Sequence, residues 1–269
     1  MFPLHVAREA KRRGLAVVGF GLRGWVDPAL ARLVDHYEEI DIGQLGHLLS
    51  RLTAHQVRAA VMAGKVTKEV FLDPRIQFDA EAMAIISRIT NFSVHHVLGA
   101  IGGRLAQHGV ELLDSSAFLK DSLCPVGVLS RRGPSDQERE DIRIGMRVAQ
   151  QLAELDVGQT VVVKRSVIAA VEALDGTDAA IRRGGQVAGP GCVVVKMASP
   201  HQDRRFDLPI IGLQTLAVLR EAQASCVALE AGSALLLDRQ PFLSQADQAG
   251  VCVIGLDPTG TDPIGQASG

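Results

Sequence analysis

Three Val- and Ala-rich runs in the second half of the sequence are each followed at once by a charged residue. These residues are Glu172, Lys196 and Glu230. Short apolar runs of this kind are typical of buried strands, and ligands of α/β sheets gather at the carboxyl ends of strands. We therefore expect two carboxylates and one ammonium group at one edge of a sheet. The alternative is that each strand simply ends where polar residues begin.

The segment 200–209, Pro-His-Gln-Asp-Arg-Arg-Phe-Asp-Leu-Pro, concentrates charge beside an apolar stretch. Asp203 and Asp207 are four residues apart in it. They could bind one divalent cation, since hard cations take oxygen ligands. Arg204 and Arg205 could hold a phosphate through paired hydrogen bonds. This combination predicts phosphoryl or pyrophosphoryl chemistry, and the alternative is a solvated loop whose charges pair with one another.

Two turns combine a glycine with groups that suit an anion. Gly176, Thr177 and Asp178 open a predicted helix, whose first N–H groups would face an anion, and two arginines follow one turn later. Asp178 could equally compensate the helix dipole. Gly64 and Lys65 give the same arrangement in the first half of the chain, where the glycine permits close approach of the backbone and the lysine supplies a cation.

The segment 19–24, Gly-Phe-Gly-Leu-Arg-Gly, fits the dinucleotide-binding pattern G-x-G-x-x-G after a predicted strand. That pattern requires its last glycine to lie in a helix. Asp27 and Pro28 instead predict a helix that begins later, at about residue 28. We interpret the segment as a glycine-rich loop, and a dinucleotide-dependent oxidoreductase remains a minor alternative.

Apolar runs alternate with segments of helical period, which predicts an α/β protein with two domains. We expect an N-terminal Rossmann-like parallel sheet over 1–130, a C-terminal mixed α/β domain over 134–257 and a loose tail over 258–269, with the boundary in the polar stretch 130–134. The predicted strands are 15–20, 58–62, 110–113, 160–164, 167–173, 191–195, 225–229 and 251–255. The predicted helices are 3–13, 28–35, 43–52, 79–89, 93–107, 135–155, 177–183, 213–222 and 239–249.

Composition narrows the class of protein. The net charge is −2 and only 4% of the residues are aromatic, so nucleic acid is not an expected partner. The sequence contains no apolar stretch long enough to span a membrane. The four cysteines are far apart and three lie in apolar runs, which predicts buried thiols in a reducing, cytoplasmic compartment.

Several motifs closely resemble the LpxI-type UDP-2,3-diacylglucosamine pyrophosphatases of lipid A biosynthesis. In the second half they are Asp156-Val-Gly-Gln159, Val171-Glu-Ala-Leu-Asp-Gly-Thr-Asp178, Val195-Lys196, Pro200-His-Gln-Asp-Arg-Arg-Phe-Asp-Leu-Pro209 and Leu229-Glu-Ala-Gly232. In the first half the resemblance is looser, through Gly43-Gln-Leu-Gly46 and Ala63-Gly-Lys-Val66. It covers nearly the whole chain.

The resemblance implies an enzyme that holds a sugar nucleotide between its two domains and hydrolyses the pyrophosphate with Mg²⁺, or another divalent cation such as Mn²⁺. The products would be UMP and 2,3-diacylglucosamine 1-phosphate. Asp207 matches the essential acid of the family and, with Asp203, would bind the metal. Glu230 or Glu172 would complete the catalytic set. The expected substrate-binding residues are Gly64, Lys65, Gln159, Glu172, Gly176, Thr177, Asp178, Lys196, Gln202, Arg204 and Arg205. A lipid-linked substrate also implies peripheral contact with the inner membrane, and a homodimer is a further expectation.

The chain departs from the family pattern in two places. Family members usually begin with a strand and a glycine-rich loop before the segment that matches Phe2-Pro3-Leu4. The family also often has an acidic pair near the position of Ser93 and Val94. These departures motivate an alternative, a non-catalytic sugar-nucleotide binding protein that lost activity with its N-terminal strand.

Overall fold

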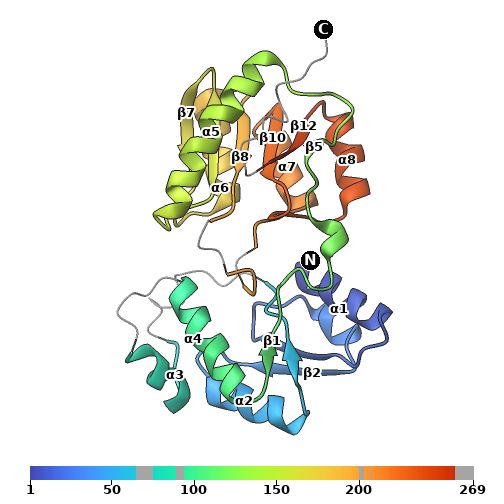
Figure 1. Cartoon of the computed structure of the whole chain (residues 1–269), viewed down its shortest axis with the longest axis vertical. Coiled ribbons are helices and arrows are strands. Elements are labelled where there is room, and N and C mark those ends of the chain that lie inside the picture. Colours follow the sequence, from blue (N-terminus) through green and yellow to red (C-terminus); the bar gives the residue numbers. More distant parts are fainter. Residues whose placement is uncertain (65–74, 89–93, 200–202, 207, 258–269) are drawn as a thin grey trace. The chain divides into compact units, whose positions relative to one another are not determined.

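The computed structural model describes residues 1–64, 75–88, 94–199, 203–206 and 208–257 (Figure 1). The chain forms two compact units. The N-terminal unit contains residues 1–120 and 203–207, and the C-terminal unit contains residues 121–202 and 208–269. The chain therefore passes from the C-terminal unit into the N-terminal unit at Asp203 and returns after Asp207.

The N-terminal unit combines helices with two parallel strand pairs, β1–β2 and β3–β4. Its helices are α1 (Phe2–Arg12), the 3₁₀ helix η1 (Pro28–Arg32), α2 (Leu45–Ala54), α3 (Ala80–Ile86) and α4 (Val94–Gln107). Its strands are β1 (Val18–Leu22), β2 (His36–Ile40), β3 (Ala59–Ala60) and β4 (Glu111–Leu112). The parallel pairing expected for this half is confirmed, but the described strands form two separate pairs rather than one sheet.

The segment 19–24 differs from its prediction as a loop. Gly19 and Gly21 lie within strand β1, and only Gly24 lies in a turn. A Cβ atom on Gly21 would lie 2.2 Å from the hydroxyl oxygen of Tyr37 on β2, so glycine at this position lets that ring cross the strand. The helix predicted from residue 28 is present as the 3₁₀ helix η1, capped by the Asp27 carboxylate.

The C-terminal unit contains a six-stranded mixed sheet in the order β5-β12-β10-β8-β6-β7. Its strands are β5 (Gly127–Val128), β6 (Thr160–Lys164), β7 (Val167–Val171), β8 (Val193–Lys196), β10 (Cys226–Glu230) and β12 (Cys252–Leu256). The unit also contains a short parallel pair, β9 (Ile210–Ile211) and β11 (Leu235–Leu236), which forms a separate two-stranded sheet. The helices are α5 (Asp136–Glu154), α6 (Thr177–Ala188), α7 (Leu213–Glu221) and α8 (Arg239–Gln248), and the 3₁₀ helix η3 (Lys120–Ser122) precedes them.

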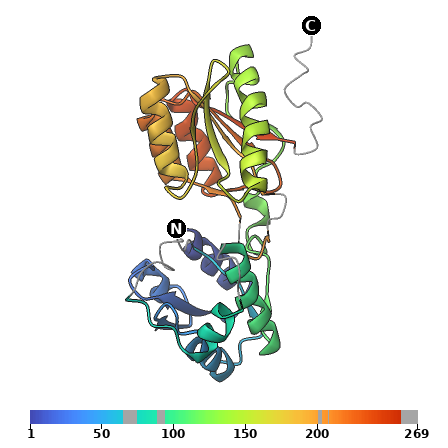
Figure 2. The ribbon, with the colours of Figure 1, turned by 90° about the vertical axis from the view of Figure 1, so that its left-hand side faces the viewer.

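Helices cover both faces of this sheet, which is why its central strands are apolar on both faces apart from polar residues at their ends. Ile142 and Ala149 of α5 pack on one face, against alternate residues such as Val193 and Val195. Helices α6, α7 and α8 pack on the other face, as Figures 1 and 2 show. The four cysteines are buried and free, as the sequence predicts. Within the described residues, no helix is long and apolar enough to cross a bilayer.

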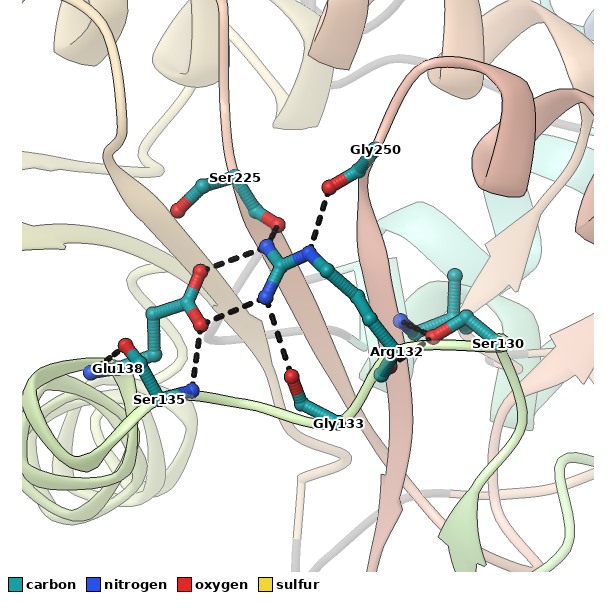
Figure 3. Close-up of polar contacts among 8 residues, drawn as sticks. Ser130, Arg132, Gly133, Ser135, Glu138, Ser225 and Gly250 are labelled. Atoms are coloured by element: carbon teal, nitrogen blue, oxygen red, sulfur yellow. Dashed lines mark hydrogen bonds and ion pairs between the residues drawn. The ribbon is translucent and has the colours of Figure 1, made fainter.

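The polar stretch 130–134, for which the sequence predicts a domain boundary, lies inside the C-terminal unit. Its Arg132 donates all five of its side-chain N–H groups to Glu138 and to the carbonyl oxygens of Gly133, Ser225 and Gly250 (Figure 3). The hydroxyl group of Ser130 accepts a hydrogen bond from the backbone of β12. The sequence predicts a linker here because the stretch is polar. In the structure, these polar groups instead form hydrogen bonds that connect α5 to the central strands.

Candidate functional site

Four side chains form a bonded group at one edge of the six-stranded sheet; we call Thr160, Glu172, Thr177 and Lys196 the edge cluster. The Lys196 ammonium donates to Thr177 Oγ1 at 2.9 Å and to Thr160 Oγ1 at 3.2 Å. Its Nζ also lies 3.6 Å from Glu172 Oε2. The Thr177 hydroxyl donates to Glu172 Oε1 at 2.8 Å.

The strand directions explain why these residues meet. Strand β6 is antiparallel to both β7 and β8, so the first residue of β6 lies beside the last residue of β8. The register pairs Thr160 with Lys196. Glu172 follows the end of β7, and its backbone N–H donates to the carbonyl of Thr160 at 2.8 Å. Gly176 then turns the chain with φ of 79°, which places Thr177 at the start of α6.

The two charged side chains of the edge cluster are buried, so their protonation states depend on their partners. The Lys196 side chain is 7% exposed and that of Glu172 is 13% exposed. Burial alone would raise the pKa of Glu172. The positive charge of Lys196 and hydrogen bonds from Thr160, Thr177 and the Gln159 N–H outweigh it, so the pKa of Glu172 lies below its ordinary value. Glu172 is therefore ionised at neutral pH.

Glu230 lies at the same edge, at the end of β10. The register pairs its neighbour Leu229 with Lys196. Its Oε2 atom accepts a hydrogen bond from the Ala198 N–H at 3.0 Å, while Oε1 has no partner among the residues that the structure describes. The expectation that Glu172, Lys196 and Glu230 share one edge is therefore confirmed. Asp178 has a different partner, since its Oδ2 atom accepts a hydrogen bond from Gln214 Nε2 at 3.3 Å.

Residues 203–206 of the charged segment belong to the N-terminal unit. Arg204 Nε donates to Asp114 Oδ2 at 2.8 Å, and the carbonyl of Arg204 accepts from the Ser115 N–H at 2.8 Å. The Ser115 hydroxyl donates to the carbonyl of Arg205 at 2.7 Å. Phe206 packs against the apolar core of this unit. The backbone and one arginine of the segment are thus fixed by contacts with residues 114–116.

The carboxylate expected to bind metal at position 203 is already hydrogen-bonded. Asp203 Oδ1 accepts from the backbone N–H of Arg205 at 3.0 Å and from its Nε at 2.9 Å, and Oδ2 accepts from the same guanidinium. Asp203 and Arg205 therefore form an ion pair within the segment, as the alternative of a solvated loop with internally paired charges predicts. Among the described residues, no three His, Cys, Asp or Glu side chains lie close enough to share a metal ion. The expected magnesium site also includes Asp207, which lies outside the described residues, so that site stays a prediction.

The other predicted site residues are distributed as follows. Gln159 lies at the start of β6, where its backbone N–H donates to Glu172 Oε2 at 3.3 Å. Gly64 has φ of 130°, a conformation that favours glycine. Lys65, Gln202 and Asp207 lie outside the described residues.

Two residues of the site were not predicted from the sequence. Thr160 reads as an ordinary first residue of a strand, and only the antiparallel pairing of β6 with β8 could have placed it beside Lys196. Asp114 lies 90 residues before Arg204 in the sequence, with no local pattern that links the two.

Comparison with known proteins identifies both halves of the chain. Residues 1–122 match the family model of the LpxI N-terminal domain, and residues 125–254 match that of the LpxI C-terminal domain. The chain is 28% identical over 267 residues to the UDP-2,3-diacylglucosamine pyrophosphatase LpxI of Caulobacter vibrioides, covering 95% of this chain and 94% of that protein. Since the two models together match most of its length, this chain belongs to the LpxI family.

Proposed function

We propose that this protein hydrolyses the pyrophosphate of UDP-2,3-diacylglucosamine, a step of lipid A biosynthesis. Water would attack one phosphorus, the bond between that phosphorus and the bridging oxygen would break, and UMP and 2,3-diacylglucosamine 1-phosphate would leave. The observation that carries this proposal is the match of both LpxI domains in order along the chain, together with the activity named for the Caulobacter relative.

Each unit by itself has charged groups that could contact a pyrophosphate. In the C-terminal unit, Glu230 keeps one carboxylate oxygen available to orient water or to contact a cation. In the N-terminal unit, the side chains of Arg204 and Arg205 are 39% and 41% exposed, so each guanidinium retains surface toward solvent. A cation in such a site would offset the negative charge that the pyrophosphate carries.

A divalent cation, Mg²⁺ or Mn²⁺, is part of the proposal, with Asp207 as the expected ligand and catalytic residue. Arg205 occupies Asp203 in the described structure, so Asp203 would have to exchange that partner to bind a metal. A substitution of Asp203 would also break its ion pair with Arg205, so Asp207 is the better residue for testing metal binding.

The experiment is UMP release from UDP-2,3-diacylglucosamine with Mg²⁺, with Mn²⁺ and with excess EDTA. We expect release that EDTA abolishes and that Asp207→Asn lowers by roughly a hundredfold or more, since loss of one charge-stabilising group costs about that much. Asp136→Asn is the matched control, because Asp136 is fully exposed at the first turn of α5. Asp136→Asn should retain full activity.

The same assay separates the two hypotheses. A folded protein that binds UMP in calorimetry but releases none from the substrate would contradict hydrolysis and support the sugar-nucleotide binding protein. Full release in the presence of EDTA would contradict the cation requirement alone.

The lipid-linked nature of the substrate supports two further proposals. Peripheral contact with the inner membrane would bring the protein to a diacylated sugar nucleotide, and cosedimentation with liposomes that contain the substrate would test it. A homodimer is a separate proposal, to be tested by the mass of the protein in solution.

A further inference from the structure

We infer that Lys196 and Glu172 form a closed internal pair, in which Lys196 is a positioning residue that neutralises and holds Glu172 and does not bind the substrate. This inference revises the substrate-binding roles expected for both Lys196 and Glu172, and it rests on the proposed function only for its substrate assay. Its structural half concerns the edge cluster alone and can be tested in a protein without activity.

The first argument is the number of donors. A lysine ammonium group has three N–H bonds. In the edge cluster, Lys196 has three oxygen partners: Thr177 Oγ1 at 2.9 Å, Thr160 Oγ1 at 3.2 Å and Glu172 Oε2 at 3.6 Å. Two of the three N–H bonds therefore have hydrogen-bonded protein partners, and the Glu172 carboxylate lies within ion-pair distance of the same ammonium group. A phosphate oxygen would have to compete with these three oxygens for Lys196.

The second argument is that both oxygens of the Glu172 carboxylate already accept hydrogen bonds. Glu172 Oε1 accepts from the Thr177 hydroxyl at 2.8 Å, and Oε2 accepts from the Gln159 N–H at 3.3 Å. Thr177 thus donates to the carboxylate while it accepts from the ammonium group. A hydroxyl group that does both links the two charges into one hydrogen-bonded chain.

The third argument is burial. Lys196 as a whole residue is 5% exposed. Removing one member of a buried ion pair leaves the other charge without compensation, which is strongly destabilising. Removing both members together often costs little. The Lys196–Glu172 pair should therefore behave as a unit in mutagenesis, whereas a lysine that binds substrate should act independently of Glu172.

The pair has a clear structural task. It connects the start of β6, the end of β7, the end of β8 and the start of α6. It thereby fixes the turn 172–177, which contains Gly176 in its left-handed conformation. Among the three charged residues at this edge, Glu230 is then the one with an atom that has no partner in the described structure, and it is the residue left to meet a ligand.

The test is a double-mutant cycle of Lys196→Met and Glu172→Gln, read by urea unfolding and by KM and kcat for UMP release. Lys196→Met alone should unfold at clearly lower urea concentration than the wild-type protein. The double variant should regain most of that loss and should keep a KM within about threefold of wild type. A double variant that folds while Lys196→Met does not accumulate as folded protein would support the pair equally.

Lys164→Met is the matched control, because Lys164 lies at the other end of β6 and donates to the carbonyls of Ala188 and Pro190 at 2.8 Å and 2.6 Å. If Lys164→Met lowers the stability, adding Glu172→Gln to it should not restore that stability. If no form of the cycle folds, Thr177→Val and Thr177→Ser decide: the serine variant, which keeps the bridging hydroxyl, should retain stability that the valine variant loses. Equal stability of these two variants would overturn the inference.

A stable Lys196→Met variant whose KM rises roughly tenfold or more, with no recovery in the double variant, would also overturn it, since that pattern marks a direct charged contact with substrate. If the wild-type protein itself releases no UMP, the proposed function fails. The urea cycle still decides whether Lys196 and Glu172 act as a unit.

Discussion

At the N-terminus of α5, the carboxyl group of Glu138 is held ionised against the effect of its own burial. Desolvation would raise its pKa, but the paired hydrogen bonds from Arg132 and the N–H of Ser135 lower the pKa to about 2. The same carboxylate completes the capping box of α5, as Ser135 and Glu138 predict from their spacing. One side chain therefore joins the helix cap to Arg132 (Figure 3).

The Glu138→Gln variant should be less stable than the wild-type protein at pH 7 by about 1–3 kcal/mol, because the charged bonds to Arg132 are lost. The pKa of Glu138 is lower in the folded protein than its ordinary value of 4.5. Its contribution is therefore fully present above about pH 4.5 and is lost as the pH falls toward 2. Urea unfolding of both proteins between pH 7 and pH 2.5 should show the difference shrinking over that window.

Glu140→Gln is the control for this prediction, since the Glu140 side chain is 41% exposed on the same helix and, among the described residues, pairs with Arg143 alone. It should change stability by less than about 0.5 kcal/mol at pH 7. A difference between Glu138→Gln and wild type that stays constant down to pH 2.5 would contradict the assignment of an ionised, paired Glu138.

Single residues also mark how far the site can be predicted from sequence. Glu172, Lys196 and Glu230 are predictable because a strand end is a local pattern, and parallel order brings such ends together. The partners of these charges are not, since Thr160 meets Lys196 only through strand pairing. The distant Asp114 likewise meets Arg204 only through the tertiary fold.

At the scale of elements, the helices and the central strands of the second half follow their predictions within a few residues, because each is apolar or amphipathic over its length. Strand β2 was missed. Its sequence, His-Tyr-Glu-Glu-Ile, contains two carboxylates that argue against a strand. The structure compensates for one of them, since Glu38 is bonded to Arg51 of α2 and to His55, the residue that follows this helix. That compensation is tertiary and leaves no local signal.

Three helical glycines of the C-terminal unit allow close packing, two of them against the sheet and one against the end of α7. A Cβ atom on Gly184 of α6 would lie 2.6 Å from the side chain of Val162, and one on Gly145 of α5 would lie 2.6 Å from that of Val195. On Gly185 it would lie 2.6 Å from Ala222 of the loop after α7. Each distance is shorter than a normal van der Waals contact, so a larger residue would clash at these positions. Glycine lowers the helix propensity but permits the close packing.

Gly184→Ala should lower stability by about 1–3 kcal/mol, because the added methyl group overpacks the contact with β6. Gly103→Ala in α4 is the matched control, since no atom lies within 4 Å of a Cβ atom there. It should raise stability by about 0.5–1 kcal/mol through helix propensity alone. Thermal unfolding checks both, and a stabilising Gly184→Ala would contradict the close packing.

At the scale of the whole molecule, each unit has apolar clusters of its own. Leu49 lies in the core of the N-terminal unit, and Leu219 lies in the core of the C-terminal unit. No residue belongs to both of these clusters. Chains with separate cores commonly unfold in more than one step.

Calorimetry should therefore resolve two unfolding transitions. Leu49→Ala and Leu219→Ala each remove a buried side chain, which costs roughly 2–5 kcal/mol, and each should lower only the transition of its own unit. A single transition that moves as a whole in both variants would show that the two units unfold together.

The order of strands in the larger sheet has a consequence for the growing chain on the ribosome. Strand β12, the last strand that the structure describes, lies between β5 and β10 rather than at an edge. The N-terminal unit likewise includes Asp203–Asp207, which are translated long after its other residues. The N-terminal unit therefore cannot be completed when residues 1–120 emerge, and the larger sheet of the C-terminal unit cannot be completed before β12 emerges. Both must wait with apolar surface exposed, a stage at which nascent proteins depend on chaperones.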